Sequence, residues 1–159
     1  MMRKRKVYVE TSVWGAVLDA EPAYYREAAR KLLSRADDFE FFISPVVGRE
    51  IRTAPPKIRQ RLEDILSEVN PVPLDETEEI VILAGEYVSR GIFPGTYRND
   101  ALHVASASYY VLDFLASYNF RYIVRVSRRE LVRAANTVLG FHTPIILSPE
   151  ELAEERWEE

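Results

Sequence analysis

The amino-acid sequence predicts a single three-layer α/β/α domain with a mostly parallel central sheet. Short apolar runs of strand length alternate with longer segments in which apolar residues recur at helical spacing. The first run, Val7–Val9, contains no polar residue, as expected for a strand buried on both faces. The 159 residues, 47% hydrophobic and 29% charged, suit one domain with a sizeable core. We expect that domain over residues 1–159, with its core at about 7–147 and a C-terminal helix at 149–159.

The first half of the chain contains two expected strands and three expected helices. The stretch Val7–Trp14 is rich in β-branched and aromatic residues and predicts the first strand. Ser44 followed by Pro45 is typical of a helix N-terminus, because a hydroxyl caps the helix and proline tolerates the missing N–H. The expected elements are a strand in 7–14, a helix from Pro22, a strand at 39–43, a helix from Pro45 to a break at 53–56, and a helix at 58–69.

Turn and cap residues divide the second half in the same way. We expect Asp75 to cap a helix that ends just before Gly91, and Gly140 to end another helix. Ser148 and Glu151 have the spacing of a capping box. The expected elements are an extended piece at 71–74, a helix from Asp75, a helix from Asn99–Asp100, a strand at 114–117, a short element at 123–124, a helix at 131–139, a strand at 145–147 and a terminal helix.

Composition excludes several classes of function. The formal net charge of −4 argues against general binding of polyanions by the whole surface. The absence of cysteine excludes a disulfide framework, a thiol nucleophile and a cysteine-based zinc site, and two histidines are too few for a histidine-rich metal site. Any metal would be bound by oxygen, which favours Mg²⁺ or Mn²⁺. The basic N-terminus lacks the apolar core of a signal peptide and no stretch reaches transmembrane length, so we expect a cytoplasmic protein without membrane contact.

Four polar residues share one kind of position in the predicted fold. Glu10 ends a strand, Glu50 lies early in the helix after a strand, Asp100 opens a helix and Asn119 follows a strand. In a parallel sheet these positions lie along one edge, so the four side chains are able to converge. Three carboxylates around one point repel one another unless a divalent cation binds between them. Such a cation activates water and offsets charge on a phosphodiester, which is the outline of a metal-dependent nuclease.

Each of these residues also has a purely structural interpretation. Asp100 is able to act only as a helix cap, and Glu50 as a solvated residue or half of a weak ion pair. Asn119 alone indicates little, because asparagine is common after strands. Glu10 is the hardest to explain structurally, since it interrupts a strand of the buried type.

Four segments carry a resemblance to a known family. Val7–Trp14 resembles the opening motif of PIN-domain proteins, which usually has an apolar pair followed by Asp-Thr-Ser. Asn99–Ala105 resembles their second signature, and Ser117–Phe120 the segment with their fourth polar residue. Ser44-Pro45 followed by Glu50 is similar to the helix that supplies their second acid. The order and spacing fit over residues 7–147, and the most similar subgroup is that of the VapC-type toxins.

The resemblance implies a Mg²⁺- or Mn²⁺-dependent endoribonuclease that cleaves single-stranded RNA with metal-activated water. It also implies a homodimer and a cognate antitoxin protein. Glu10, Glu50 and Asp100 would be the acidic catalytic metal ligands and Asn119 the fourth, weaker one. Thr11 or Ser12 would orient water or a ligand.

Two positions depart from the family pattern. Glu10 stands where the family usually has Asp, and Asn119 is an amide where Asp is also found. These departures motivate an alternative, a catalytically silent relative that binds RNA or protein. A phosphotransfer enzyme on a doubly wound sheet is a third hypothesis, but it usually needs an Asp nucleophile where this chain has Glu10.

Residues beside the four polar positions are candidates for substrate contact. His103 is able to bond Asp100 or a phosphate, or to have only a structural partner. A basic stretch follows Asn119 and consists of Arg121, Arg125, Arg128, Arg129 and Arg133. It is either an RNA backbone track or a solvated face paired to the acidic tail at 150–159, which contains Trp157. Tyr97 and Tyr118 either stack on unpaired bases or pack within the protein. The candidate substrate-binding residues are Thr11, Ser12, Arg98, His103, Arg121 and Arg125.

Overall fold

The computed structural model describes residues 3–155, and its centre is a five-stranded sheet in which every neighbouring pair of strands is parallel. The strand order is β3-β2-β1-β4-β5, so the first strand of the chain lies in the middle. This arrangement confirms the predicted mostly parallel sheet. The strands are β1 (Arg5–Val9), β2 (Phe39–Ile43), β3 (Val72–Pro73), β4 (Phe114–Ala116) and β5 (Ile145–Leu147).

The first strand is shorter than the sequence indicates. The strand β1 ends at Val9, and Thr11–Trp14, predicted as strand, begins the helix α1 (Thr11–Asp19). The reason is the Glu10 carboxylate, which accepts a hydrogen bond from the backbone N–H of Ser12 and so caps the helix. Val13 and Trp14 are fully buried, and the Trp14 indole donates to the Val9 carbonyl. The buried β-branched and aromatic residues at the start of α1 therefore have the residue pattern of a strand although they are helical.

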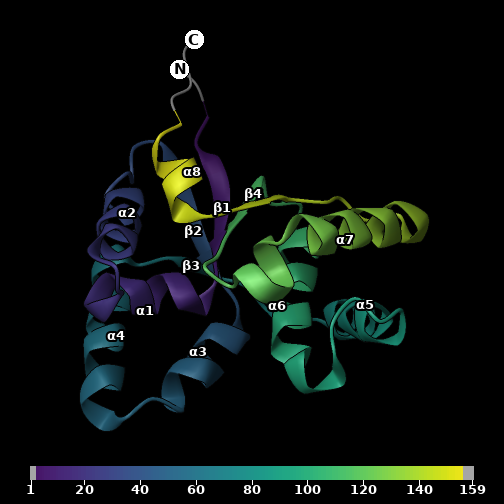
Figure 1. Ribbon diagram of the computed structural model, residues 1–159, viewed down its shortest axis with the longest axis horizontal. Coiled ribbons are helices and arrows are strands. Elements are labelled where there is room, and N and C mark those ends of the chain that lie inside the picture. Colours follow the sequence, from purple (N-terminus) through teal and green to yellow (C-terminus); the bar gives the residue numbers. More distant parts are fainter. Residues whose placement is uncertain (1–2, 156–159) are drawn as a thin grey trace.

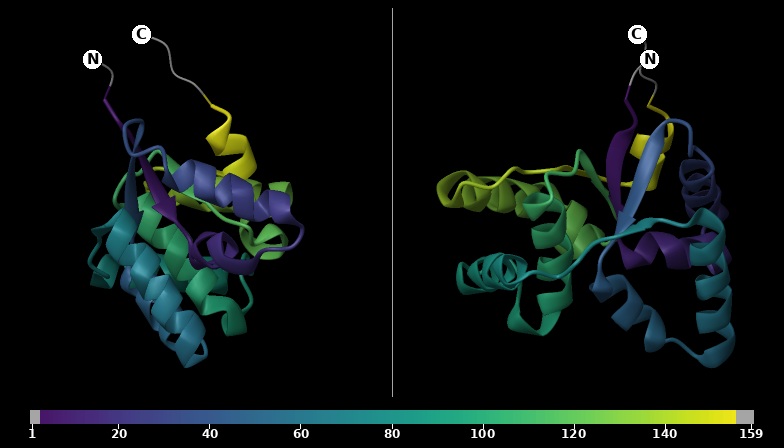
Figure 2. Two further views of the ribbon diagram at one scale, coloured as in Figure 1. Left: turned by 90° about the vertical axis from the view of Figure 1, so that its left-hand side faces the viewer. Right: turned by 180° about the vertical axis from the view of Figure 1, so that it is seen from behind.

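Helices cover both faces of the sheet (Figures 1 and 2). The helices α1, α2 and α4 lie on one side and α5, α6 and α7 on the other, which confirms the three layers. None of the described helices is both long and apolar enough to cross a membrane. Beyond α1 the helices are α2 (Ala23–Leu33), α3 (Pro45–Arg52), α4 (Pro56–Val69), α5 (Glu78–Ser89), α6 (Arg98–Tyr109), α7 (Val126–Leu139) and α8 (Pro149–Ala153), with a short 3-10 helix at Gly95–Tyr97 and a π-helical turn at Phe120–Val124.

Most predicted helix ends are confirmed. Ser44 precedes Pro45 at the start of α3, Gly140 ends α7 in the left-handed conformation, and Ser148 forms a complete capping box with Glu151. The helix α8 ends at Ala153, and the predicted continuation through Trp157 lies outside the described residues.

Three predicted boundaries were wrong. Thr77 rather than Asp75 caps α5, because its hydroxyl accepts the hydrogen bond from the Ile80 N–H. The short element expected at 123–124 is the end of a π-helical turn. The helix α7 starts at Val126, earlier than the predicted residue 131, since no residue of its first turn, 126–129, is buried and the apolar periodicity is therefore missing there.

A buried polar group joins the helices of the second face. The fully buried Asn136 of α7 accepts a hydrogen bond from the Tyr87 hydroxyl of α5, at 2.5 Å. Its amide donates to Ser108 Oγ of α6 at 3.0 Å and to the His142 carbonyl at 3.2 Å. Buried polar groups that are satisfied in this way fix the relative positions of the elements that carry them. The network therefore holds α6, the helix that contains Asp100, in one register.

We predict that Asn136→Ala destabilises the protein by about 2–4 kcal/mol, because it removes the 2.5 Å acceptor of the buried Tyr87 hydroxyl and leaves that group only its 3.4 Å contact with Ser108. Urea unfolding followed by circular dichroism measures the change. The matched control is Val138→Ala on the same helix, where the side chain is 74% exposed. A loss for Asn136→Ala no larger than that of the control would contradict the proposed role of the network.

Candidate active site

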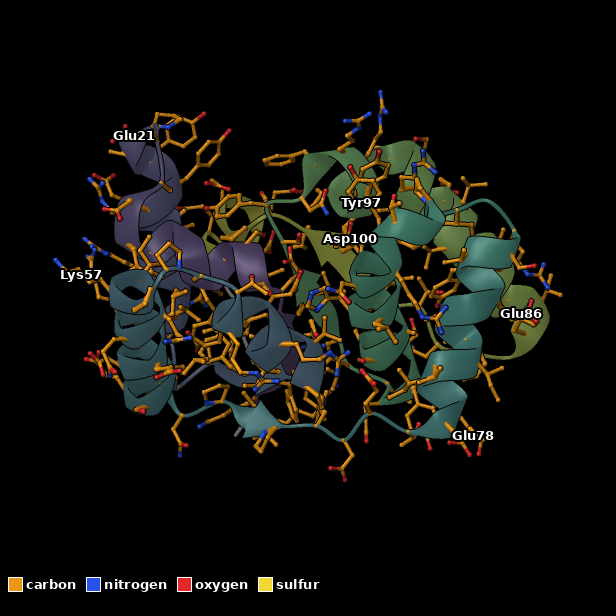
Figure 3. All side chains as sticks on the ribbon, turned by 90° about the horizontal axis from the view of Figure 1, so that it is seen from below. Glu21, Lys57, Glu78, Glu86, Tyr97 and Asp100 are labelled. Atoms are coloured by element: carbon orange, nitrogen blue, oxygen red, sulfur yellow. The ribbon has the colours of Figure 1, made fainter. Side chains whose placement is uncertain are left out.

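The polar residues singled out from the sequence meet where β1 and β4 end. Glu10 follows β1, Asn119 follows β4, Glu50 lies on α3 after β2, and Asp100 lies on α6. Figure 3 looks onto this edge of the molecule and places Asp100 in its middle. Because carboxyl ends of parallel strands share one edge, the sheet topology alone brings these distant segments together.

Glu10 is held by three hydrogen bonds although it is almost completely buried. The exposed fraction of the residue is 5%. Its carboxylate accepts from the Ser12 N–H at 2.8 Å, the Ser12 hydroxyl at 2.7 Å and the Ser117 hydroxyl at 2.5 Å. A buried carboxylate needs such partners to remain ionised. Glu10 therefore caps α1 and at the same time presents a fixed negative charge at the edge of the sheet.

A chain of side-chain hydrogen bonds leads from the sheet to Glu50. The Tyr8 hydroxyl, buried in the central strand, contacts Ser44 Oγ at 2.7 Å and His103 Nδ1 at 2.5 Å. The other ring nitrogen of His103 contacts Glu50 Oε1 at 2.6 Å. The Thr11 hydroxyl also donates to that carboxylate oxygen, at 2.7 Å. One oxygen of Glu50 is thus fixed by the protein, and the carboxylate keeps a second oxygen for other contacts.

The charged forms of Glu50 and His103 stabilise each other. Burial by itself would raise the pKa of Glu50, but the hydrogen bond and charge of His103, with smaller contributions from Thr11 and Asn99, lower it below its usual value. Burial would lower the pKa of His103, but the bond to Glu50 and the charges of Glu10, Glu50 and Asp100 raise it. The imidazolium form of His103 is therefore favoured by the surrounding carboxylates.

Asp100 carries the least compensated charge of the group. It is the third residue of α6, Tyr97 occupies the N-cap position, and no side chain caps that helix, so the interpretation of Asp100 as a mere cap is wrong. Burial and the charge of Glu10 raise the pKa of Asp100 to about 6, while His103 and a hydrogen bond from the Asn119 side chain act in the opposite direction. The Asn119 side chain therefore lies near Asp100.

The residues fit a divalent cation held by oxygen. Ligand atoms of Glu10, Glu50 and His103 all lie within 4.8 Å of one another. Both nitrogens of His103 already contact protein atoms, so the carboxylates are the better donors. The raised pKa of Asp100 indicates negative charge that the protein leaves partly unbalanced. A hard cation with oxygen ligands matches this donor set.

The candidate substrate-binding residues divide into two groups. Thr11 and Ser12 bond the acids, and His103 is fully buried with both ring nitrogens occupied, so none of its surface is open to a substrate. Arg98, Arg121 and Arg125 are exposed around the site. Tyr97 is 41% exposed and packs on Tyr122, with ring centroids 4.4 Å apart.

The rest of the basic stretch has structural partners. Arg128 and Arg129 donate to the Ile92 and Ile146 carbonyls, and Arg133 pairs with Glu130. In the acidic tail, Glu154 pairs with Lys31 and Glu150 accepts from the Tyr118 hydroxyl. Arg121 lies over the Tyr122 ring at 5.1 Å, and both Arg121 and Arg125 are exposed to solvent.

Sequence reasoning missed Tyr8, Ser44 and Ser117 as members of the site. Ser44 was noted only as a cap, but its hydroxyl bonds Tyr8 and makes no cap bond. Ser117 follows β4 directly, as Glu10 follows β1, and this shared position was the available signal. Tyr8 had one signal too, because a phenol in a strand buried on both faces needs a polar partner.

Comparisons with known proteins agree with this geometry. The sequence matches the family model of the PIN domain over residues 7–129. The fold is similar to a chain of VapBC2 from Rickettsia felis, solved bound to a DNA fragment from its promoter, with a TM-score of 0.55 and 16% identity over 90% of this chain and 98% of that one. It is also similar to VapC20 of Mycobacterium tuberculosis, described as a toxin that cleaves the sarcin-ricin loop, with a TM-score of 0.58 and 17% identity over 73% and 92% of the two chains. No curated protein matches the sequence at a significant level.

We predict that, in EDTA, Asp100→Asn raises the melting temperature at pH 7. The folded-state pKa of Asp100, about 6, lies above its unfolded value, so the folded protein binds the proton more tightly. The destabilising effect of Asp100 is therefore absent below about pH 4 and complete above about pH 6. The difference in melting temperature between variant and wild type should grow through that window.

Asp113→Asn is the control with the opposite sign. Burial opposes the shift, but bonds from Arg3 and the Lys6 N–H lower the pKa of Asp113, so its contribution is stabilising above the unfolded value and is lost as the pH falls. This variant should melt below wild type at pH 7. Parallel curves for wild type and Asp100→Asn at all pH values would show that Asp100 is not in the repulsive environment described above.

Proposed function

Because the chain belongs to the PIN-domain family of nucleases, we propose that it is a metal-dependent endoribonuclease that cleaves single-stranded RNA. The observation that supports this most directly is the convergence of Glu10, Glu50 and Asp100 at one edge of the sheet. Substrates that carry phosphodiesters repel such a group of acids unless a cation lies between them.

Glu10, Glu50 and Asp100 would hold Mg²⁺ or Mn²⁺, with the Asn119 amide as the fourth, weaker member. A bound divalent cation lowers the pKa of a water molecule and offsets charge on the phosphate. The protein's part is to keep the carboxylates ionised and fixed. Ser12 and Ser117 do this for Glu10, and Thr11 and His103 do it for Glu50. No side chain acts as a covalent nucleophile in this mechanism.

The hydrogen bonds support an active site despite the two departures from the family pattern. Glu10 is one methylene longer than the usual Asp, but its carboxylate turns back onto the Ser12 N–H and does not extend freely. Asn119 accepts from the Tyr122 N–H and its side chain also bonds Asp100, so it positions that acid although it brings no charge. His103, which is fully buried, fixes the position of Glu50 through the hydrogen bond between them.

Exposed cations around the site would bind the RNA backbone. Arg98, Arg121 and Arg125 are exposed next to the acids, and phosphate contacts by arginine position a nucleic acid without reading its sequence. Tyr97, also exposed, offers a ring for stacking. An RNA-cleaving protein of this kind would act in the cytoplasm.

We further propose that the protein is the toxin of a type II toxin-antitoxin pair, with a cognate antitoxin and a homodimeric state. The toxin role and the antitoxin are supported by the two structural neighbours, one a VapBC2 assembly and the other a VapC toxin. The neighbour from Rickettsia felis covers nearly the full length of both chains, so the whole described fold participates in the similarity.

We predict that the purified protein cleaves single-stranded RNA in Mn²⁺ or Mg²⁺ and that EDTA abolishes cleavage. Glu50→Gln removes a charge and should lower the rate by at least about two orders of magnitude, because a hard cation loses a charged ligand. Gel analysis of a labelled RNA measures both effects.

The matched control is Glu63→Gln, an exposed glutamate on α4 that should leave the rate unchanged. Cleavage that persists in EDTA would contradict the metal mechanism. Metal-independent RNA binding without cleavage would favour the silent binding module instead.

A second prediction concerns the affinity for Mn²⁺, measured by calorimetry. Asn119→Asp should tighten Mn²⁺ binding by adding a carboxylate, while lowering the melting temperature in EDTA by adding repulsion with Asp100. Asp100→Asn should weaken Mn²⁺ binding by at least about tenfold and raise that melting temperature. Equal Mn²⁺ affinity in wild type and Asp100→Asn would show that the cation binds elsewhere.

A further inference from the structure

A cavity of about 510 Å³ opens beside the candidate active site and is not used by the mechanism above. It lies between α1, the start of α2, the start of α4 and the segment that follows β4. Its volume is within the range of about 300–1,000 Å³ found for small-molecule sites. Ser12, whose hydroxyl donates to Glu10, is part of its wall, so one residue separates the cavity from that acid.

Three aromatic rings line the cavity. The centroids of Tyr25 and Tyr118 are 5.0 Å apart in an edge-on arrangement, and Phe120 lies 6.3 Å from Tyr25 and 6.1 Å from Tyr118. The Tyr118 hydroxyl is anchored to the Tyr25 carbonyl and to Glu150, while Phe120 remains 47% exposed. Fixed rings with an exposed face suit stacking on a flat, unpaired ligand.

The floor of the cavity is kept open by a residue without a side chain. Gly15 lies in the middle of α1, where glycine disfavours the helix relative to other residues. A Cβ built on Gly15 would have no atom within 4 Å, so packing does not require glycine there. A larger side chain at this position would instead extend into the cavity. A substitution of Gly15 therefore fills the cavity without a clash at the new Cβ atom.

Two carboxylates belong to the lining of the cavity. Asp19 ends α1 and Glu21 follows it, and Figure 3 shows Glu21 far from Asp100 and Tyr97. These acids repel a phosphate, so the backbone of a nucleic acid would stay outside. Asp19 pairs with Arg61 at 3.6 Å, whereas no ion pair of Glu21 is seen in the described part of the chain. The Glu21 oxygens are therefore the better acceptors for amino groups, which the Watson–Crick edges of cytosine, adenine and guanine provide.

We propose that this cavity binds one unpaired base of the RNA next to the scissile phosphodiester, with a preference for bases that carry an exocyclic amino group. The proposal rests on the proposed ribonuclease function and adds a specificity site to it. Ser12, shared by the cavity wall and by the hydrogen bond to Glu10, places a bound base next to that acid. The rings supply stacking, and the Glu21 carboxylate favours a base over a phosphate.

The test is fluorescence anisotropy with labelled hexacytidylate and hexauridylate, in Ca²⁺ so that oxygen ligands are occupied by a cation. Wild type should bind hexacytidylate more tightly, because cytosine has an amino donor where uracil has a carbonyl. Gly15→Leu should weaken binding by about tenfold or more, the scale of one lost base stack, and Phe120→Ala should weaken it in the same direction. Mn²⁺ affinity by calorimetry should not change in either variant.

Gly85→Leu is the matched control. Gly85 is also a helical glycine with no atom within 4 Å of its Cβ position, but it lies on α5, which does not line the cavity. Leucine favours helices more than glycine does, so neither leucine variant should lower the melting temperature.

The outcomes separate the two proposals. If wild type and Gly15→Leu bind RNA with the same affinity, the base site is overturned, the ribonuclease function is not, and a protein becomes the expected ligand of the cavity. Equal affinity of wild type for the two oligonucleotides would overturn the amino-group preference. No RNA binding by wild type in any cation would overturn the ribonuclease function as well.

Discussion

The hydrogen bond between His103 and Glu50 is the contact on which the rest of the site depends. It joins α6 to α3 across the carboxyl edge of the sheet, and the ring is completely buried. Removal of a buried partner leaves an uncompensated charge, which costs far more than the bond itself contributes. Because Tyr8 holds the opposite nitrogen, the central strand determines where Glu50 stands. The strand, both helices and the acid therefore form one unit.

This unit is fixed from the core side as well. The helix α6 is buried from Asp100 to Ser108, and Ser108 takes part in the Asn136 network with α5 and α7. A helix held at both ends cannot move Asp100 without disturbing the packing of the opposite face. Close packing transmits such displacements because interiors have few voids. The position of the acids is thus a consequence of the whole second layer, and not only of the loops around the site.

The sequence predicts the site well where position along the chain determines it. Strand ends in a parallel sheet share an edge, so Glu10, Glu50, Asp100 and Asn119 were identifiable from element order alone. The bond from His103 to Tyr8 was not, because these residues are 95 positions apart and only the packed structure brings them together. The strand assigned to Thr11–Trp14 failed for a local reason, since burial at a helix start imitates a strand pattern. The cap assigned to Asp75 failed because Thr77, two residues on, offers the better hydroxyl.

Charge balance unites the unusual residues of this site. The site brings three carboxyl groups together with one histidine, and a divalent cation bound among them would offset charge that His103 does not balance. A fourth carboxylate at position 119 would exceed that balance, so the Asn119 amide suits a site in which Glu50 is already paired with a buried histidine. Burial first, and then the charges of Glu10 and Glu50, raise the pKa of Asp100, because a proton removes a buried charge and the repulsion together. The departures of Glu10 and Asn119 from the family pattern are therefore consistent with each other. The hydrogen bond from the Ser12 N–H restrains the longer side chain of Glu10. His103 contacts Glu50 and so stabilises part of the negative charge that a cation would otherwise have to balance.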